Sequence, residues 1–175
     1  MVEESVPIRH FYSDWTQYRS RLVEGVRGLT DEQPAISAGP GHAPIWALAA
    51  HCAGVRVYWL CGVLGEPGAG TTPFPDPWAE LGWEDDLDHP RSADELVHAL
   101  ETTGAIIERV LDTWTPDDLE IEFERRYGEI IQIHTRRSIL LRLLSHDVFH
   151  SGEISQLLGV HGLPAIDLWA RRPRA

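Results

Sequence analysis

Two histidines fall on the buried face of a helix predicted near the end of the chain. The apolar pattern from about Thr135 to Leu158 has the periodicity of an amphipathic helix. Four residues advance a helix by about 400°, so His146 and His150 lie one turn apart on one face, about 6 Å from each other. The same face carries Ile139, Leu143, Ile154 and Leu157. Because buried polar groups need partners, the fold must bring either hydrogen-bonding groups or a metal ion to these imidazoles.

Glu153 falls on the same face, about 20° from His146 at roughly 100° per residue. A carboxylate at this position either binds a metal ion directly or orients an imidazole that does. The histidine pair alone fits both a metal site and two hydrogen-bonded core histidines. A third histidine on another element is needed to decide between them.

The segment Ile45–Leu64 is apolar on almost every side and predicts a second helix. Arg56 and His51 near its middle argue against a membrane span, because ionisable groups are costly in hydrocarbon. Such a helix belongs at the centre of a bundle or in a dimer interface. On its helical wheel, His51 shares a stripe with Val55 and Tyr58. The second helix therefore supplies a third inward-facing histidine.

The rest of the chain predicts two further helices and a hairpin. Apolar residues at steps of three and four indicate a helix over 11–29, and another over 96–114 that begins at a capping box in 92–95. Alternating residues on either side of Tyr127 and Gly128 indicate a short hairpin.

The connection over residues 65–91 is long and rich in proline and aromatic residues, which is typical of a lid, a binding loop or a packed surface loop. With the four helices, it predicts an all-α fold: a four-helix bundle with a long crossover loop and a short β-hairpin before the last helix, in a single domain over 1–175. The tail after Pro164 is expected to be an extended strap anchored by Trp169.

Composition and charge limit which binding partners and which cellular compartment the sequence predicts. The net charge is −12 and no basic cluster is present, so nucleic-acid binding is disfavoured. Cys52 and Cys61 lie on opposite sides of the second helix, and the N-terminus does not resemble a signal peptide, so we expect a reduced, cytoplasmic protein that does not enter a membrane. We also expect a homodimer, because the second helix has more apolar perimeter than one bundle face buries and points Trp46, Trp59 and Leu60 away from His51.

One histidine from the second helix and two from the fourth can converge on a single metal ion between these helices. Three neutral protein ligands leave a position open for water or substrate, as in catalytic zinc sites. The sequence therefore predicts a divalent-metal site, with zinc the first expectation, that acts on a small-molecule substrate.

The order of the elements, the phrase Ile45–His51 and the phrase His146–Ile154 resemble the DinB/YfiT superfamily of four-helix metalloenzymes. The resemblance spans the whole chain and implies a metal-binding triad of His51, His146 and His150. It also implies zinc, nickel or iron as the metal, a dimer, and in some members thiol S-transfer or isomerisation with mycothiol or bacillithiol. Many relatives have glutamine where Glu153 stands, so this carboxylate is either a fourth ligand or a group that orients a histidine.

Two other functions compete with a thiol transferase. The run from His146 to His150 is close to the H-E-x-x-H motif of zinc peptidases, but Asp147 is shorter than glutamate and lies about 100° away from His146. A bundle that only binds a metal or ligand is the stronger rival. If the chain is an enzyme, a thiol or a water is activated at the metal, Glu153 orients a ligand or moves a proton, Tyr58 donates to a developing anion, and Arg142 pairs with a substrate carboxylate.

Overall fold

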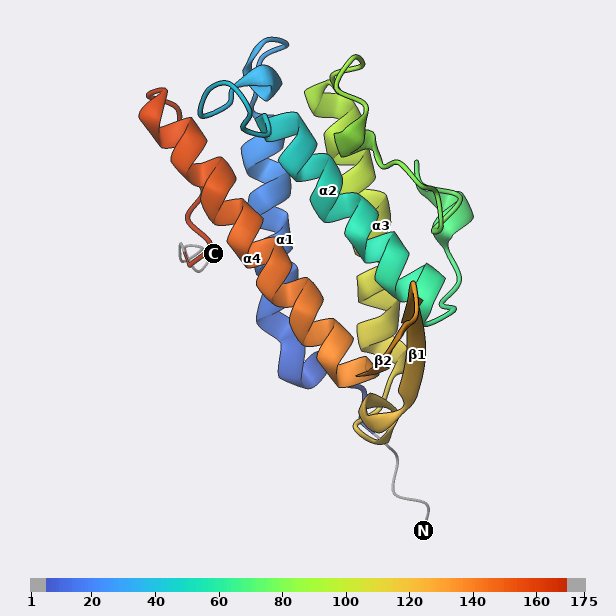
Figure 1. The fold of residues 1–175 in the computed structure, drawn as a ribbon. Coiled ribbons are helices and arrows are strands. Elements are labelled where there is room, and N and C mark those ends of the chain that lie inside the picture. The colour runs from blue at the N-terminus through green and yellow to red at the C-terminus, as the bar shows by residue number, and fades with distance from the viewer. Residues whose placement is uncertain (1–5, 170–175) are drawn as a thin grey trace.

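The computed structural model describes residues 6–169. In this range four long helices lie side by side, and a two-stranded antiparallel hairpin lies at one end of them (Figure 1). The elements are α1 (Arg9–Arg27), α2 (Ile45–Val57), α3 (Ala93–Thr113), β1 (Glu122–Tyr127), β2 (Ile130–Thr135) and α4 (Arg136–Val160). Helix α2 packs against α3 and α4, and α1 packs against the same two helices. The mostly helical architecture with its hairpin confirms this part of the sequence-based prediction.

Side-chain caps explain where two of the helices begin. Ser92 Oγ accepts a hydrogen bond from the backbone N–H of Glu95, and the Glu95 carboxylate accepts one from the backbone N–H of Ser92, which confirms the predicted capping box at α3. Thr135 and Ser138 exchange the corresponding bonds at the start of α4. The hairpin pairs Tyr127 with Ile130 around Gly128, whose φ of +59° suits the tight turn.

The second helix changes its geometry where the sequence predicts a regular helix up to Leu64. Residues Tyr58–Val63 form a π-helical segment that continues α2. The backbone N–H of Leu64 donates to the carbonyl of Trp59 at 3.1 Å, five residues earlier in the chain. The wider turn alters which side chains share a face, so the predicted α-helical stripe holds only as far as Val57.

A buried ion pair, Arg56–Asp147, joins all four helices. Arg56 of α2 donates to one carboxylate oxygen of Asp147 in α4 through Nε and Nη2, at 3.2 and 3.1 Å. Its Nη1 donates to the carbonyl of Leu100 in α3, and Nε1 of Trp15 in α1 donates to the second oxygen of Asp147 at 3.2 Å. The side chains of the pair are only 1% and 4% exposed. Because Asp147 directly follows His146, this network fixes the part of α4 that carries the candidate site.

The surface differs from the prediction at two places. Trp46, Trp59 and Leu60 are buried within the single chain, so they provide no apolar face for a partner; the homodimer stays a prediction without that support. Trp169 is 71% exposed, and the neighbouring Leu168 is buried in its place, so the predicted anchor was wrong by one residue. Among residues 6–169, no helix combines the length and apolarity needed to cross a membrane.

Candidate metal centre

The three predicted histidines come together between α2 and α4. The ring centre of His51 lies 4.8 Å from that of His146 and 5.2 Å from that of His150, and the two rings of α4 are 4.4 Å apart. One nitrogen from each ring can be chosen so that all three lie within 4.8 Å of one another. The one-turn spacing on α4 and the antiparallel neighbour α2 together produce this convergence.

Carboxylates hold two of the three rings. Nδ1 of His51 contacts Oε1 of Glu84 at 2.8 Å, and Nδ1 of His150 contacts Oε2 of Glu153 at 2.5 Å. A carboxylate accepts, so each contact places the ring proton on Nδ1 and leaves the lone pair on Nε2. Histidines that bind metals are commonly oriented by a carboxylate in this way. Glu153 therefore lies where it orients His150.

His146 completes the site from the protein interior. Its Nε2 lies 3.0 Å from Nε2 of His51, a separation suited to two adjacent ligands of one ion with metal–nitrogen bonds of about 2.0–2.1 Å. Partial burial, followed by the nearby His150, His51, Arg56 and Arg142, lowers the pKa of His146 to about 4. The ring is thus neutral at neutral pH, which metal binding requires. Its Nδ1 is buried and has no hydrogen-bond partner among the described residues, so no carboxylate orients this third ring.

A second group, Cys52 with His146 and Asp147, is less suited to a metal ion. Arg56 and Trp15 already occupy both oxygens of Asp147. Burial is the main cause that raises the pKa of the Cys52 thiol, so the sulfur stays protonated, whereas a ligand must be a thiolate. The same bonds leave Asp147 unavailable as the general base of a zinc peptidase. The three-histidine group, by contrast, offers neutral lone pairs and fits a divalent ion.

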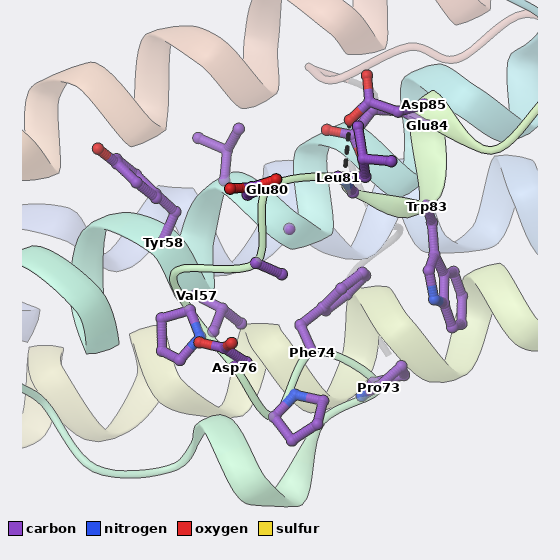
Figure 2. A pocket seen from close by; sticks show the side chains of 16 residues that line it. Val57, Tyr58, Pro73, Phe74, Asp76, Glu80, Leu81, Trp83, Glu84 and Asp85 are labelled. Carbon is purple, nitrogen blue, oxygen red and sulfur yellow. Dashed lines mark hydrogen bonds between the residues drawn. The ribbon is translucent and has the colours of Figure 1, made fainter. Parts of the chain in front are cut away.

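Two cavities each include a carboxylate that contacts one of the three histidines, although no histidine of the group lines either cavity. The first, of about 490 Å³, lies between α2 and the loop after it; Figure 2 shows Tyr58 at one end and Trp83 at the other, with Phe74 between them. Glu84, the partner of His51, belongs to its wall. The second cavity, of about 550 Å³, is lined by Glu153, the partner of His150. The long loop of residues 65–91 therefore lines a pocket next to the candidate metal centre.

Comparison with known protein families shows to which family the chain belongs. A sequence profile of the DinB superfamily matches residues 14–154. The chain belongs to the DinB superfamily. A crystal structure of a DinB-like protein from Bacillus cereus ATCC 10987 resembles it with a TM-score of 0.69 and 20% sequence identity, covering 93% of this chain and 97% of that one. At this identity the likeness shows a shared fold. A comparison with curated proteins gave no match.

Among the described residues, two predicted site residues of this DinB-superfamily protein, Tyr58 and Arg142, form no hydrogen bond with the three histidines, although the charge of Arg142 contributes to the lowered pKa of His146. The Tyr58 hydroxyl accepts a hydrogen bond from Nε of Arg125 at 2.6 Å, and its ring lines the first cavity. Arg142 is exposed, and its guanidinium lies 4.9 Å from the ring centre of Trp59. Their predicted roles toward a substrate stay predictions.

Two residues near the site were not found from the sequence. Glu84 lies in the Pro-rich loop, 33 residues after His51, and the only sequence signal was the acidic and aromatic character of that loop. Arg125 lies on β1, and its approach to Tyr58 depends on how the hairpin folds back on α2. Neither contact follows from helical periodicity.

Proposed function

We propose that this protein holds one divalent metal ion, zinc before nickel or iron, through His51, His146 and His150 on a four-helix bundle. The observation that carries the proposal is the convergence of three ring nitrogens within 4.8 Å, two of them on rings held by carboxylates. Membership of the DinB superfamily supports the same assignment.

We further propose that the bound metal serves an enzyme that joins a low-molecular-weight thiol to a small-molecule substrate. When bound, the metal supplies Lewis acidity, which lowers the pKa of a coordinated thiol or water toward neutral pH. Glu84 and Glu153 keep the lone pairs of their histidines directed at the centre. Two separate cavities support a reaction between two molecules, because the wall of one contains Glu84 and the wall of the other contains Glu153, the two carboxylates that hold the histidine rings.

The main alternative is a bundle that binds a metal or ligand without catalysis. In that case Glu153 could close the centre as a fourth ligand, which is one of the two roles that the sequence allows. The 2.5 Å contact joins an oxygen of Glu153 to Nδ1 of His150, which leaves Nε2 of the ring for the metal. This contact favours the orienting role of Glu153. A metal-dependent hydrolase is the remaining candidate, and it needs only water in place of the thiol.

A cobalt-substituted protein tests these functions. Adding a thiol such as cysteine should change the visible spectrum and add a charge-transfer band if a coordination position is exchangeable. Glu153→Gln should respond in the same way as the wild type, since the wild-type carboxylate is expected to bind the ring and not the ion. A wild-type spectrum that ignores every thiol, together with a Glu153→Gln spectrum that responds, would mean that Glu153 seals the centre, and the transferase function would have to be abandoned.

A further inference from the structure

Two arginines without a carboxylate partner lie against one indole ring near the histidines. The guanidinium carbons of Arg125 and Arg142 are 5.2 and 4.9 Å from the ring centre of Trp59, so they are at most about 10 Å apart. Neither arginine forms an ion pair within residues 6–169. The chain carries a net charge of −12, and most of its described arginines are ion-paired, so two such cations side by side need another explanation.

The arginine pair, Arg125 and Arg142, retains unused hydrogen-bond donors. Arg125 donates through Nε to Tyr58 and through Nη1 to the side-chain oxygen of Gln132, at 2.6 and 2.9 Å, which leaves Nη2. The Arg142 side chain donates to no described group, so its full fork of N–H groups is available. The Tyr58 oxygen accepts from Arg125, so its own O–H is free to donate.

The position of the arginine pair connects the candidate metal centre with the first cavity. Arg142 stands four residues before His146 on α4, one turn away on the same face, about 6 Å along the axis. Tyr58, which Arg125 contacts, lines the cavity between α2 and the loop. That cavity is walled mainly by apolar and aromatic side chains, among them Phe74, Leu81 and Trp83. Neither arginine lines this cavity, but Tyr58 both lines it and accepts the hydrogen bond from Arg125, so the arginine pair lies behind one residue of its wall.

We propose that Arg125 and Arg142, with the Tyr58 hydroxyl, bind the carboxylate of a small-molecule substrate whose apolar body lies in the first cavity. This rests on the proposed function, because it names the class of molecule on which that centre acts. A planar carboxylate matches the two parallel N–H groups of the Arg142 fork, and Arg125 and Tyr58 add one donor each. The four acidic side chains in the cavity wall, Asp76, Glu80, Glu84 and Asp85, disfavour a second negative charge on the apolar end.

The competing explanation is that the two arginines only cover Trp59. Stacking on an indole is a normal contact for arginine and needs no ligand. The local charge indicates a further role for the two arginines. The ring centre of His134 lies 4.9 Å from that of Trp59, and the pKa of His134 is lowered first by partial burial and then by the charges of Arg142 and Arg125. The same positive field attracts a carboxylate.

Calorimetric titration of the purified protein with 3-phenylpropionate tests the proposal, with 3-phenylpropanamide as the uncharged control. The carboxylate should bind and the amide should bind at least about tenfold more weakly. Arg142→Gln and Arg125→Gln should each weaken 3-phenylpropionate by about tenfold or more. Arg126→Gln, the next residue on the same strand and exposed, should leave the affinity unchanged. Inorganic phosphate should bind more weakly than the carboxylate.

His146→Ala separates this inference from the proposed metal function. If the arginine pair holds the carboxylate, His146→Ala should still bind 3-phenylpropionate, even when its metal is gone. Loss of binding in His146→Ala with full binding in Arg142→Gln would mean that the carboxylate sits on the metal, and would overturn the inference. Equal affinity for the acid and the amide, unchanged affinity in both arginine variants, or tighter binding of phosphate would overturn it as well.

Discussion

Replacing Asp147 with alanine tests whether the Arg56–Asp147 network holds the helices that carry the histidines. Asp147 accepts two hydrogen bonds from Arg56 and one from Trp15, at 3.1–3.2 Å, and its side chain is 4% exposed. Alanine removes both acceptor oxygens, and with them all three hydrogen bonds, and leaves the Arg56 charge buried without a counter-charge. Removing one partner of a buried ion pair costs about 3–5 kcal/mol, and the lost bond from Trp15 adds about 1 kcal/mol.

A loss of this size is a large fraction of the roughly 5–15 kcal/mol that stabilises an ordinary domain. Urea unfolding followed by circular dichroism measures it as a lower midpoint at an unchanged slope. Asp147→Asn keeps the shape and one acceptor, so we expect it to fold and to lose about half as much. It provides the measurement if Asp147→Ala is too unstable to purify.

The matched control is Glu120→Ala. Glu120 pairs with Arg137 at 3.0 Å, but both side chains are more than 60% exposed, so this loss should stay below about 1 kcal/mol. The reasoning would be refuted if Asp147→Ala and Asp147→Asn were no more destabilising than Glu120→Ala. That outcome would mean that apolar packing alone sets the positions of α2 and α4.

Three further predictions concern the site and the assembly. In the metal-free protein the free energy of unfolding should fall as the pH drops from 6.5 to about 4, because the lowered pKa of His146 makes the unfolded chain bind more protons in that window; His146→Gln should reduce this slope in urea titrations at several pH values. Gly82→Ala should weaken metal affinity about 10–100-fold in a chelator competition, because a Cβ at this position overlaps the Glu84 carboxylate and displaces it from His51, whereas Glu80→Ala should not. Light scattering at micromolar concentration should find a homodimer, and a monomer alone would contradict that expectation.

The helices and the three histidines could be predicted because they depend on local periodicity. The i, i+4 spacing of His146 and His150 and the apolar residues around them determine which face of α4 is buried. His51 was found in the same way, since it precedes the π-helical segment and lies where α2 is regular. Local pattern was therefore sufficient for the residues that form the centre.

Apart from Glu153, which helical periodicity places beside His150, the surroundings of the centre could not be predicted, because they depend on segments that meet only in the folded chain. The contact of Glu84 with His51 needs the conformation of an aperiodic loop. Trp59 was predicted to face outward, but the π-helical turn and the cover supplied by Arg125 and Arg142 bury it. The burial of Trp59 depends on tertiary contacts and on the π-helical geometry, neither of which a helical wheel represents.

The metal content of the purified protein tests the central claim most directly. Elemental analysis should find about one divalent ion per chain in the wild type, and His51→Ala, His146→Ala and His150→Ala should each lose it. His134→Ala is the matched control, because this ring packs on Trp59 outside the three-histidine group, and it should keep the ion. Full occupancy in the triple His51, His146 and His150 variant would contradict the account.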